Sequence, residues 1–136
     1  DDVYANGPVS YLQMDALPEP GDYAPIISAL KNGEYFVTSG EVLIPSHHYE
    51  GSGSEMVLVA DVEWTFPLDF VEVVFGDGSE TTTVTLSAKD LPAFGSESFR
   101  IPFDGTGQAW VRFAAWDYAG NGAMTMPVRL GRTPSP

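Results

Sequence analysis

The sequence predicts a mainly β protein, an antiparallel β-sandwich of about seven strands preceded by one short helix. From residue 54 onward, apolar and polar residues alternate with the period of two that half-buried strands show. Turn-forming residues recur between these runs at about the 8–12-residue spacing typical of antiparallel sandwiches. No run with a helical period separates the strands, which argues against alternating strands and helices. A closed barrel is the nearest alternative, and strand count alone does not exclude it.

The first part of the chain is predicted to run from a loop through a helix into two short strands. Residues 1–22 contain three prolines and two glycines, a composition that opposes regular structure. A helix is expected at residues 23–32, with Asp22 as N-cap, Pro25 in the first turn and Gly33 at the C-terminal stop. A helix this short is not stable alone, so its apolar face needs a partner surface. The apolar residues on that face are Ile26, Ile27 and Leu30. Two short strands should follow, at residues 35–37 and 41–44.

The rest of the chain is predicted to be strand after strand, following a polar loop at residues 46–54. The six strands expected there are residues 55–66, 69–75, 80–87, 96–103, 108–116 and 123–130. Alternation along these strands selects the residues that should form the core of the sandwich. They are Leu58, Val62, Val73, Phe99, Val111 and Phe113.

Length and charge narrow the classes of protein to consider. A chain of 136 residues favours a single domain, and its hydrophobic fraction of 43% is that of a globular protein. A net charge of −13 argues against nucleic acid and anionic membranes as partners. No window of 18 apolar residues is present, so we expect no membrane insertion. The absence of cysteine excludes a disulfide scaffold, a thiolate zinc site and a cysteine nucleophile, and it leaves the compartment open.

The run from Asp117 to Gly122 is a candidate metal loop. Asp117 and Asn121 stand at the first and fifth positions of a calcium-loop pattern, with Gly122 at the sixth. The third and twelfth positions are Ala119 and Val128, so two expected ligands are missing. We therefore interpret the run as a hairpin turn, in which Asp117 accepts backbone N–H bonds and the Gly-Asn-Gly segment tolerates positive φ.

His47 and His48 are the other candidate metal ligands, adjacent in the predicted polar loop. Neighbouring residues of an extended chain point to opposite sides, so the two imidazoles cannot easily converge on one ion. An exposed structural loop is the favoured interpretation. We expect no cofactor, and no divalent ion bound more tightly than about millimolar.

Carboxylates and tryptophans supply two further hypotheses. Asp61 and Glu63 share one strand face, and Glu72 is expected across the sheet from them. Paired carboxylates can serve acid–base chemistry, but the apolar opposite face of the strand favours solvent-facing acids here. The three tryptophans are Trp64, Trp110 and Trp116. They could form a sugar-stacking platform, although positions in or beside the core are favoured.

Two stretches resemble known families. The run WVRFAAWDYAGNG, residues 110–122, resembles the penultimate strand and turn of bacterial immunoglobulin-like domains, where an Asp-x-Ala-Gly-Asn turn precedes the last strand. Residues 27–41, ISALKNGEYFVTSGE, are similar to the ALxxGxxFVTxGE segment that follows the metal-binding barrel in the polymerase-and-histidinol-phosphatase (PHP) class of metallohydrolases. In that group a C-terminal sandwich often follows directly. Together with the strands between them, the stretches cover most of residues 23–130.

The resemblance implies an immunoglobulin-like sandwich at residues 46–136. Residues 1–45 would then be a loop, the short helix and lead-in strands, forming the tail of a preceding barrel domain. The metal ligands of that family lie on the barrel, and neither His47 nor His48 matches a ligand position. We therefore expect a non-catalytic accessory domain, without metal or cofactor, whose partner is the preceding catalytic domain of a larger metallohydrolase-like protein. The start at Asp1-Asp2 suits a segment of a longer chain, and an exported location, periplasmic or extracellular, is favoured.

An independent extracellular module that binds carbohydrate or protein is the alternative. A row of exposed indoles would favour that module, and buried indoles the accessory role. A complete enzyme would need a convergent polar pocket that the sequence does not indicate. On the accessory interpretation residues 1–22 should be loosely held, and residues 35–44 should be tied to the sheet.

Overall fold

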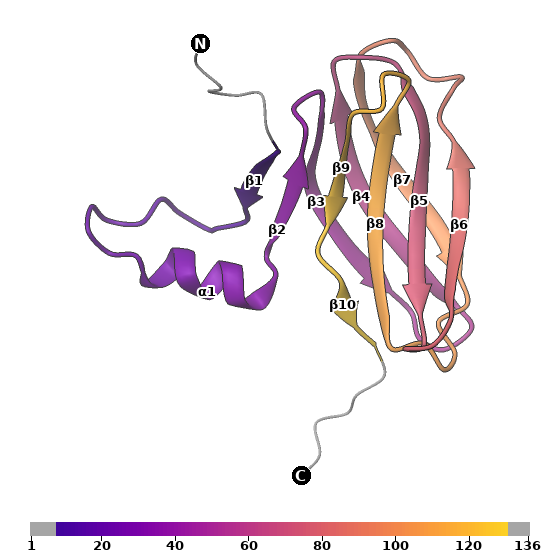
Figure 1. Cartoon of the computed structure of the whole chain (residues 1–136), viewed down its shortest axis with the longest axis horizontal. Helices are drawn as coiled ribbons and strands as arrows, with labels where there is room; N and C mark the ends of the chain where they lie inside the picture. Colours follow the sequence, from indigo (N-terminus) through magenta and orange to yellow (C-terminus); the bar gives the residue numbers. More distant parts are fainter. Residues whose placement is uncertain (1–7, 131–136) are drawn as a thin grey trace.

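The computed structural model describes residues 8–130, which form two antiparallel sheets and one short helix (Figure 1). The strands of the larger sheet, sheet A, are β1 (Val9–Leu12), β2 (Tyr35–Thr38), β5 (Leu68–Gly76), β6 (Thr81–Ser87), β8 (Trp110–Asp117), β9 (Gly122–Thr125) and β10 (Val128–Arg129). Sheet B consists of β3 (Val42–Glu50), β4 (Met56–Trp64) and β7 (Gly95–Phe103), in the order β3-β4-β7. Sheet A has the order β1-β2-β9-β8-β5-β6, with β10 also paired to β8. The predicted mainly β fold is confirmed.

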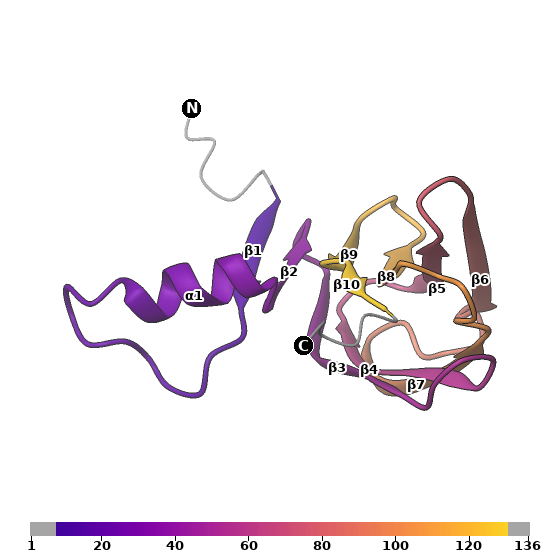
Figure 2. The same ribbon diagram turned by 90° about the horizontal axis from the view of Figure 1, so that it is seen from below.

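The two sheets face each other and enclose the apolar core, an arrangement consistent with a β-sandwich (Figure 2). All six residues predicted for the core are buried, none more than 5% exposed. The alternation in β4 explains why: its even-numbered residues from Met56 to Trp64 are buried, and the odd-numbered ones face outward. Both sheets remain open rather than closing into a single barrel.

The last predicted strand, residues 123–130, is divided into β9 and β10, which both pair with β8. Pro127 lies between them and has no N–H group to donate to a sheet. The Oγ1 atom of Thr125 compensates at the break, because it accepts a 3.0 Å hydrogen bond from the buried N–H of Phe113. A side chain thus replaces a backbone partner where the ladder is interrupted.

The predicted polar loop at residues 46–54 is wrong in its first half, because β3 continues to Glu50. Ser46 to Glu50 pairs with Val57 to Asp61 of β4. Since β3 is an edge strand, its outward side chains reach water, and polar residues are tolerated there. The proposed domain boundary between residues 45 and 46 accordingly falls within this strand.

Residues 35–44 are tied to the sandwich, as predicted: β2 pairs with β9, and β3 pairs with β4. The prediction of a loop over residues 1–22 is wrong at Val9–Leu12, because these residues form β1 and pair with β2. The prediction of loosely held residues 1–22 falls partly on residues 1–7, which lie outside the described part.

The predicted helix is present as α1 (Ala24–Asn32). Tyr23, not Asp22, occupies the N-cap position, and Asp22 accepts a hydrogen bond from the N–H of Ala24 at 3.2 Å. Gly33 ends the helix with φ of 69°, as its position predicted. No helix in residues 8–130 is long and apolar enough to cross a membrane.

Residues 8–34, here called the arm, comprise β1, α1 and the segment between them. Both views show α1 standing to one side of the sandwich, beyond the edge at which β1 and β2 extend sheet A (Figures 1 and 2). The backbone N–H of Gln13 donates to the carbonyl oxygen of Glu34 at 2.7 Å. This hydrogen bond joins the residue that follows β1 to the residue that precedes β2.

Candidate functional site

The arm carries a disproportionate share of the exposed apolar surface. Six of the eleven large apolar side chains exposed within residues 8–130 belong to it, although it is less than a quarter of that length. These six are Val9, Tyr11, Leu17, Tyr23, Ile27 and Leu30. Exposed apolar side chains gathered in one region indicate an interaction surface rather than chance exposure.

The clearest candidate is one side of α1, which the described residues leave uncovered. Tyr23, Ile27 and Leu30 follow one another at spacings of four and three residues, so they lie on the same side of the helix. Their exposed fractions are 67%, 49% and 46%. We call these three residues the arm face.

The opposite side of α1 turns toward the rest of the arm. Ala29 is only 3% exposed and Ile26 is half-buried there. Of the apolar stripe predicted from the sequence, Ile26 is half-buried, whereas Ile27 and Leu30 are exposed. Within the described residues, the arm thus covers Ala29 and leaves Tyr23, Ile27 and Leu30 exposed.

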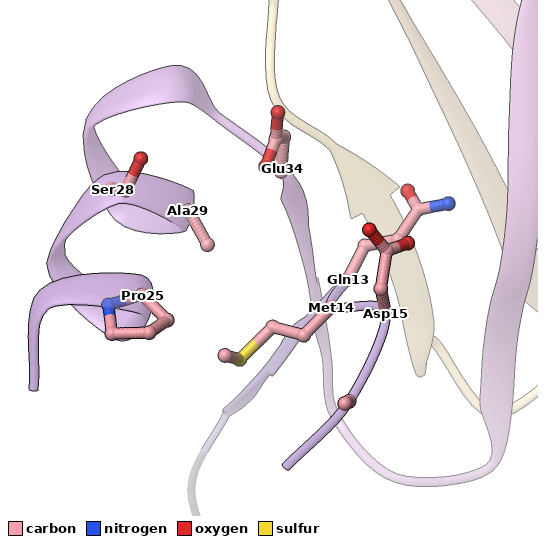
Figure 3. A pocket seen from close by; sticks show the side chains of 8 residues that line it. Gln13, Met14, Asp15, Pro25, Ser28, Ala29 and Glu34 are labelled. Atoms are coloured by element: carbon pink, nitrogen blue, oxygen red, sulfur yellow. The ribbon is translucent and has the colours of Figure 1, made fainter. Parts of the chain in front are cut away.

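An open hollow of about 570 Å³ lies between α1 and the segment that follows β1 (Figure 3). Met14 extends from that segment toward Pro25 on the helix, and Ala29 lies between Ser28 and the hollow. Asp15 and Glu34 bring two carboxylates to it. Among the described residues, no basic side chain lines this hollow.

The arm is predominantly acidic. The arm contains four carboxylates and a single basic residue, Lys31, which stands in the last turn of α1. A surface that packs on the arm face should therefore be apolar at its centre and neutral or basic at its rim.

The structure places Asp117 and Asn121 in a turn, as predicted. Asp117 is 3% exposed, and its Oδ1 accepts the N–H groups of Ala119 and Asn121, both at 2.9 Å. Gly120 has φ of 81°. Gly122 was predicted to serve the turn through a positive φ, and this prediction needs correction. Gly122 is required for close packing instead, since an added Cβ would lie 2.4 Å from the Trp116 ring.

His47 and His48 point to opposite sides of β3 and do not converge. His47 pairs with Ala60 on the core-facing side of the strand. Its pKa is lowered, mainly by burial and further by the neighbouring His48. His48 is exposed, and its Nε2 lies 3.0 Å from a Glu50 oxygen. No group of three or more potential metal ligands is found within residues 8–130.

The carboxylates Asp61 and Glu63 face solvent on sheet B, as predicted. The Ser46 hydroxyl donates to Asp61 at 2.7 Å, and this bond with that of Ser98 lowers the pKa of Asp61. The expectation that Glu72 lies across the sheet from them is wrong. Glu72 belongs to β5 in sheet A, where the indole N–H of Trp116 donates to it at 3.0 Å.

The tryptophans do not form an exposed row. Trp64 is 3% exposed, and its indole N–H donates to the carbonyl oxygen of Pro92 at 2.8 Å. Trp110 and Trp116 are half-buried on the outer side of β8, where they pack against Gly76 and Gly122. One indole is thus buried and two are half-buried on an outer face, so the criterion set from the sequence does not decide between the accessory role and the binding module.

Sequence reasoning missed Tyr23 as part of the arm face, because it was treated as the start of the helix and not as part of its stripe. The spacing of four residues between Tyr23 and Ile27 was the signal available. Comparison of the chain with protein-family models, curated proteins and solved structures finds no significant match.

Proposed function

We propose that this chain is a non-catalytic accessory domain with an immunoglobulin-like sandwich. Its arm packs against the catalytic domain that precedes it in a larger, exported metallohydrolase-like protein. The observation that carries the proposal is the arm face, where Tyr23, Ile27 and Leu30 are exposed on a helix that stands beside the sandwich.

The sequence resemblance supports the same assignment. The segment similar to the one that follows the PHP barrel, residues 27–41, contains most of α1, the whole of β2 and the start of the turn into β3. The arm is thus the part that would lie next to a preceding barrel. The Asp117 turn, with its two backbone hydrogen bonds, supports the immunoglobulin-like assignment of the last strands.

The size of the exposed surface favours a partner in the same chain. Burying the exposed part of each residue in the arm face would contribute about 1 kcal/mol, since full burial of a large apolar side chain contributes roughly 1.5–3 kcal/mol. A partner that binds from solution must also offset several kcal/mol of lost translational and rotational freedom, about 4 or more. A covalently linked domain avoids most of that cost.

The test compares this chain with a longer product that includes the residues encoded upstream. We expect His-x-His and Asp-x-His pairs in that upstream part and slow amide exchange in α1 of the longer product. The double variant Ile27→Ser/Leu30→Ser should restore fast exchange in α1. Leu86→Ser is the matched control, because Leu86 is 44% exposed but lies on β6, far along sheet A from the arm.

Enzyme assays supply the second half of the test. The purified chain should hydrolyse neither aryl phosphates nor amides when manganese or zinc is added. Reproducible turnover by this chain would overturn the accessory role. Equally fast amide exchange of α1 in this chain and in the longer product would also overturn the accessory role.

A further inference from the structure

A second, smaller cavity lies where the arm joins the sandwich, between β1 and β2 on one side and β3 on the other. Its volume is about 260 Å³. An apolar cavity of about 150 Å³ is large enough to hold benzene, so this one has room for a single substituted ring. It is separate from the arm face, and the inference below does not depend on the proposed function.

The walls of this cavity, here called the junction pocket, are mainly apolar. Tyr11 and Phe36 form one wall as a stacked pair, with ring centroids 5.2 Å apart and planes 5° from parallel. Leu43, Ile44 and Pro45 from β3 form the facing wall. Two near-parallel rings beside aliphatic side chains suit a flat, apolar ligand.

Polar groups interrupt these walls at Gln13, Tyr35 and His47, of which only His47 lies on β3. His47 lines the junction pocket from β3, and its imidazole forms no hydrogen bond with any residue of the described part. The ring of Tyr49 meets it edge-on at 6.2 Å, which holds its orientation. His48, the adjacent imidazole, already has a partner in Glu50. His47 therefore has both a donor and an acceptor free for a ligand.

Charge excludes an anionic ligand. No Lys or Arg within residues 8–130 lines the junction pocket, and residues 1–50 contain eight carboxylates against Lys31 alone. A carboxylate or phosphate placed there would lose water without gaining a cation. The described residues that line the pocket include one histidine and no carboxylate, which is too few ligands to hold a metal ion tightly.

We propose that the junction pocket binds a small, neutral, single-ring aromatic molecule bearing one hydroxyl group. The aromatic ring of the ligand packs against the Tyr11–Phe36 pair, and its hydroxyl group forms a hydrogen bond with the imidazole of His47. The class of ligand is thus a simple phenol.

The test titrates the full chain with p-cresol and follows backbone amide signals by NMR. Toluene and p-toluate are matched probes, which remove the hydroxyl or replace it with a carboxylate. We expect saturable shifts at Tyr11, Phe36 and His47, with p-cresol binding about fivefold more tightly than toluene, as one neutral hydrogen bond gives. Binding of p-toluate should be weaker still.

Two variants locate the hydrogen bond. His47→Leu keeps a side chain of similar size but removes the hydrogen-bonding nitrogens, so the affinity for p-cresol should fall to that for toluene. His48→Ala, on the opposite side of β3, should leave the affinity for p-cresol unchanged. Should His47→Leu fail to fold, the affinities of the unaltered chain for p-cresol, toluene and p-toluate still test the proposed hydrogen bond. Equal affinities for p-cresol and toluene, or shifts confined to other residues, would overturn the proposal.

Discussion

The sandwich and the arm differ in how completely each buries its own apolar residues. In the sandwich the strands of sheet B and the centre of sheet A point large side chains inward, and Val62, Val73 and Phe113 are fully buried. In the arm, Ala29 is the one buried residue between residues 8 and 34. Both regions contain regular secondary structure. Regular secondary structure therefore does not show whether a region of this chain buries its own apolar side chains. The burial of those side chains distinguishes the sandwich from the arm.

The largest expected effect is a loss of stability when a core residue of the sandwich is truncated. Phe113→Ala should lower the free energy of unfolding by about 3–5 kcal/mol, because the ring is fully buried and leaves a cavity. Ile27→Ala in the arm should change it by no more than about 0.5 kcal/mol, since half of that side chain is already exposed. Urea denaturation of both variants provides the measurement. Similar losses from the two would show that the arm is part of the same cooperative core.

A second, smaller effect tests the break in the last strand. Thr125→Val removes the hydroxyl that accepts the buried N–H of Phe113, and it should cost about 1–3 kcal/mol. Thr83→Val on the exposed edge strand β6 is the matched control and should be close to neutral. A neutral result at Thr125 would indicate that the N–H of Phe113 finds another acceptor.

The smallest expected effect concerns the junction between the two regions. Burial lowers the pKa of His47 below its usual value of 6.5, so the unfolded chain binds a proton more readily than the folded one. Stability should be full above pH 6.5 and fall as the pH drops from 6.5 toward the lower pKa of the folded state. The carboxylates with a lowered pKa, such as Asp61 and Glu50, change the stability only below their usual values of 3.8 and 4.5.

Thermal unfolding from pH 7.5 to 5 measures this dependence. His47→Leu should abolish it, and His48→Ala should retain most of it, because burial is the larger cause of the shift. A slope that persists in His47→Leu would assign the effect to another group.

Alternation was enough to predict β4 to β8 and the six core residues, because most inward positions of these strands are apolar. It failed at β3, where an edge strand tolerates Ser46, His48 and Glu50 on its outer side. It also failed at Glu72, since period two gives the face of a strand but not the sheet to which the strand belongs. The turn at Asp117 was predictable because its hydrogen bonds are local. The junction pocket was not, because residues as distant as Tyr11 and His47 meet there only through the pairing of β1, β2 and β3.

Hydrogen exchange along the isolated chain tests most directly whether the arm lacks the cover that the sandwich provides for itself. We predict slow exchange for the paired amides of β4, β5 and β8, which lie inside the two sheets. The amides of α1 should exchange many times faster, because so little packing opposes the opening of this short helix. Protection in α1 equal to that in β4 would contradict the account, since it would show that the arm is already complete without a partner.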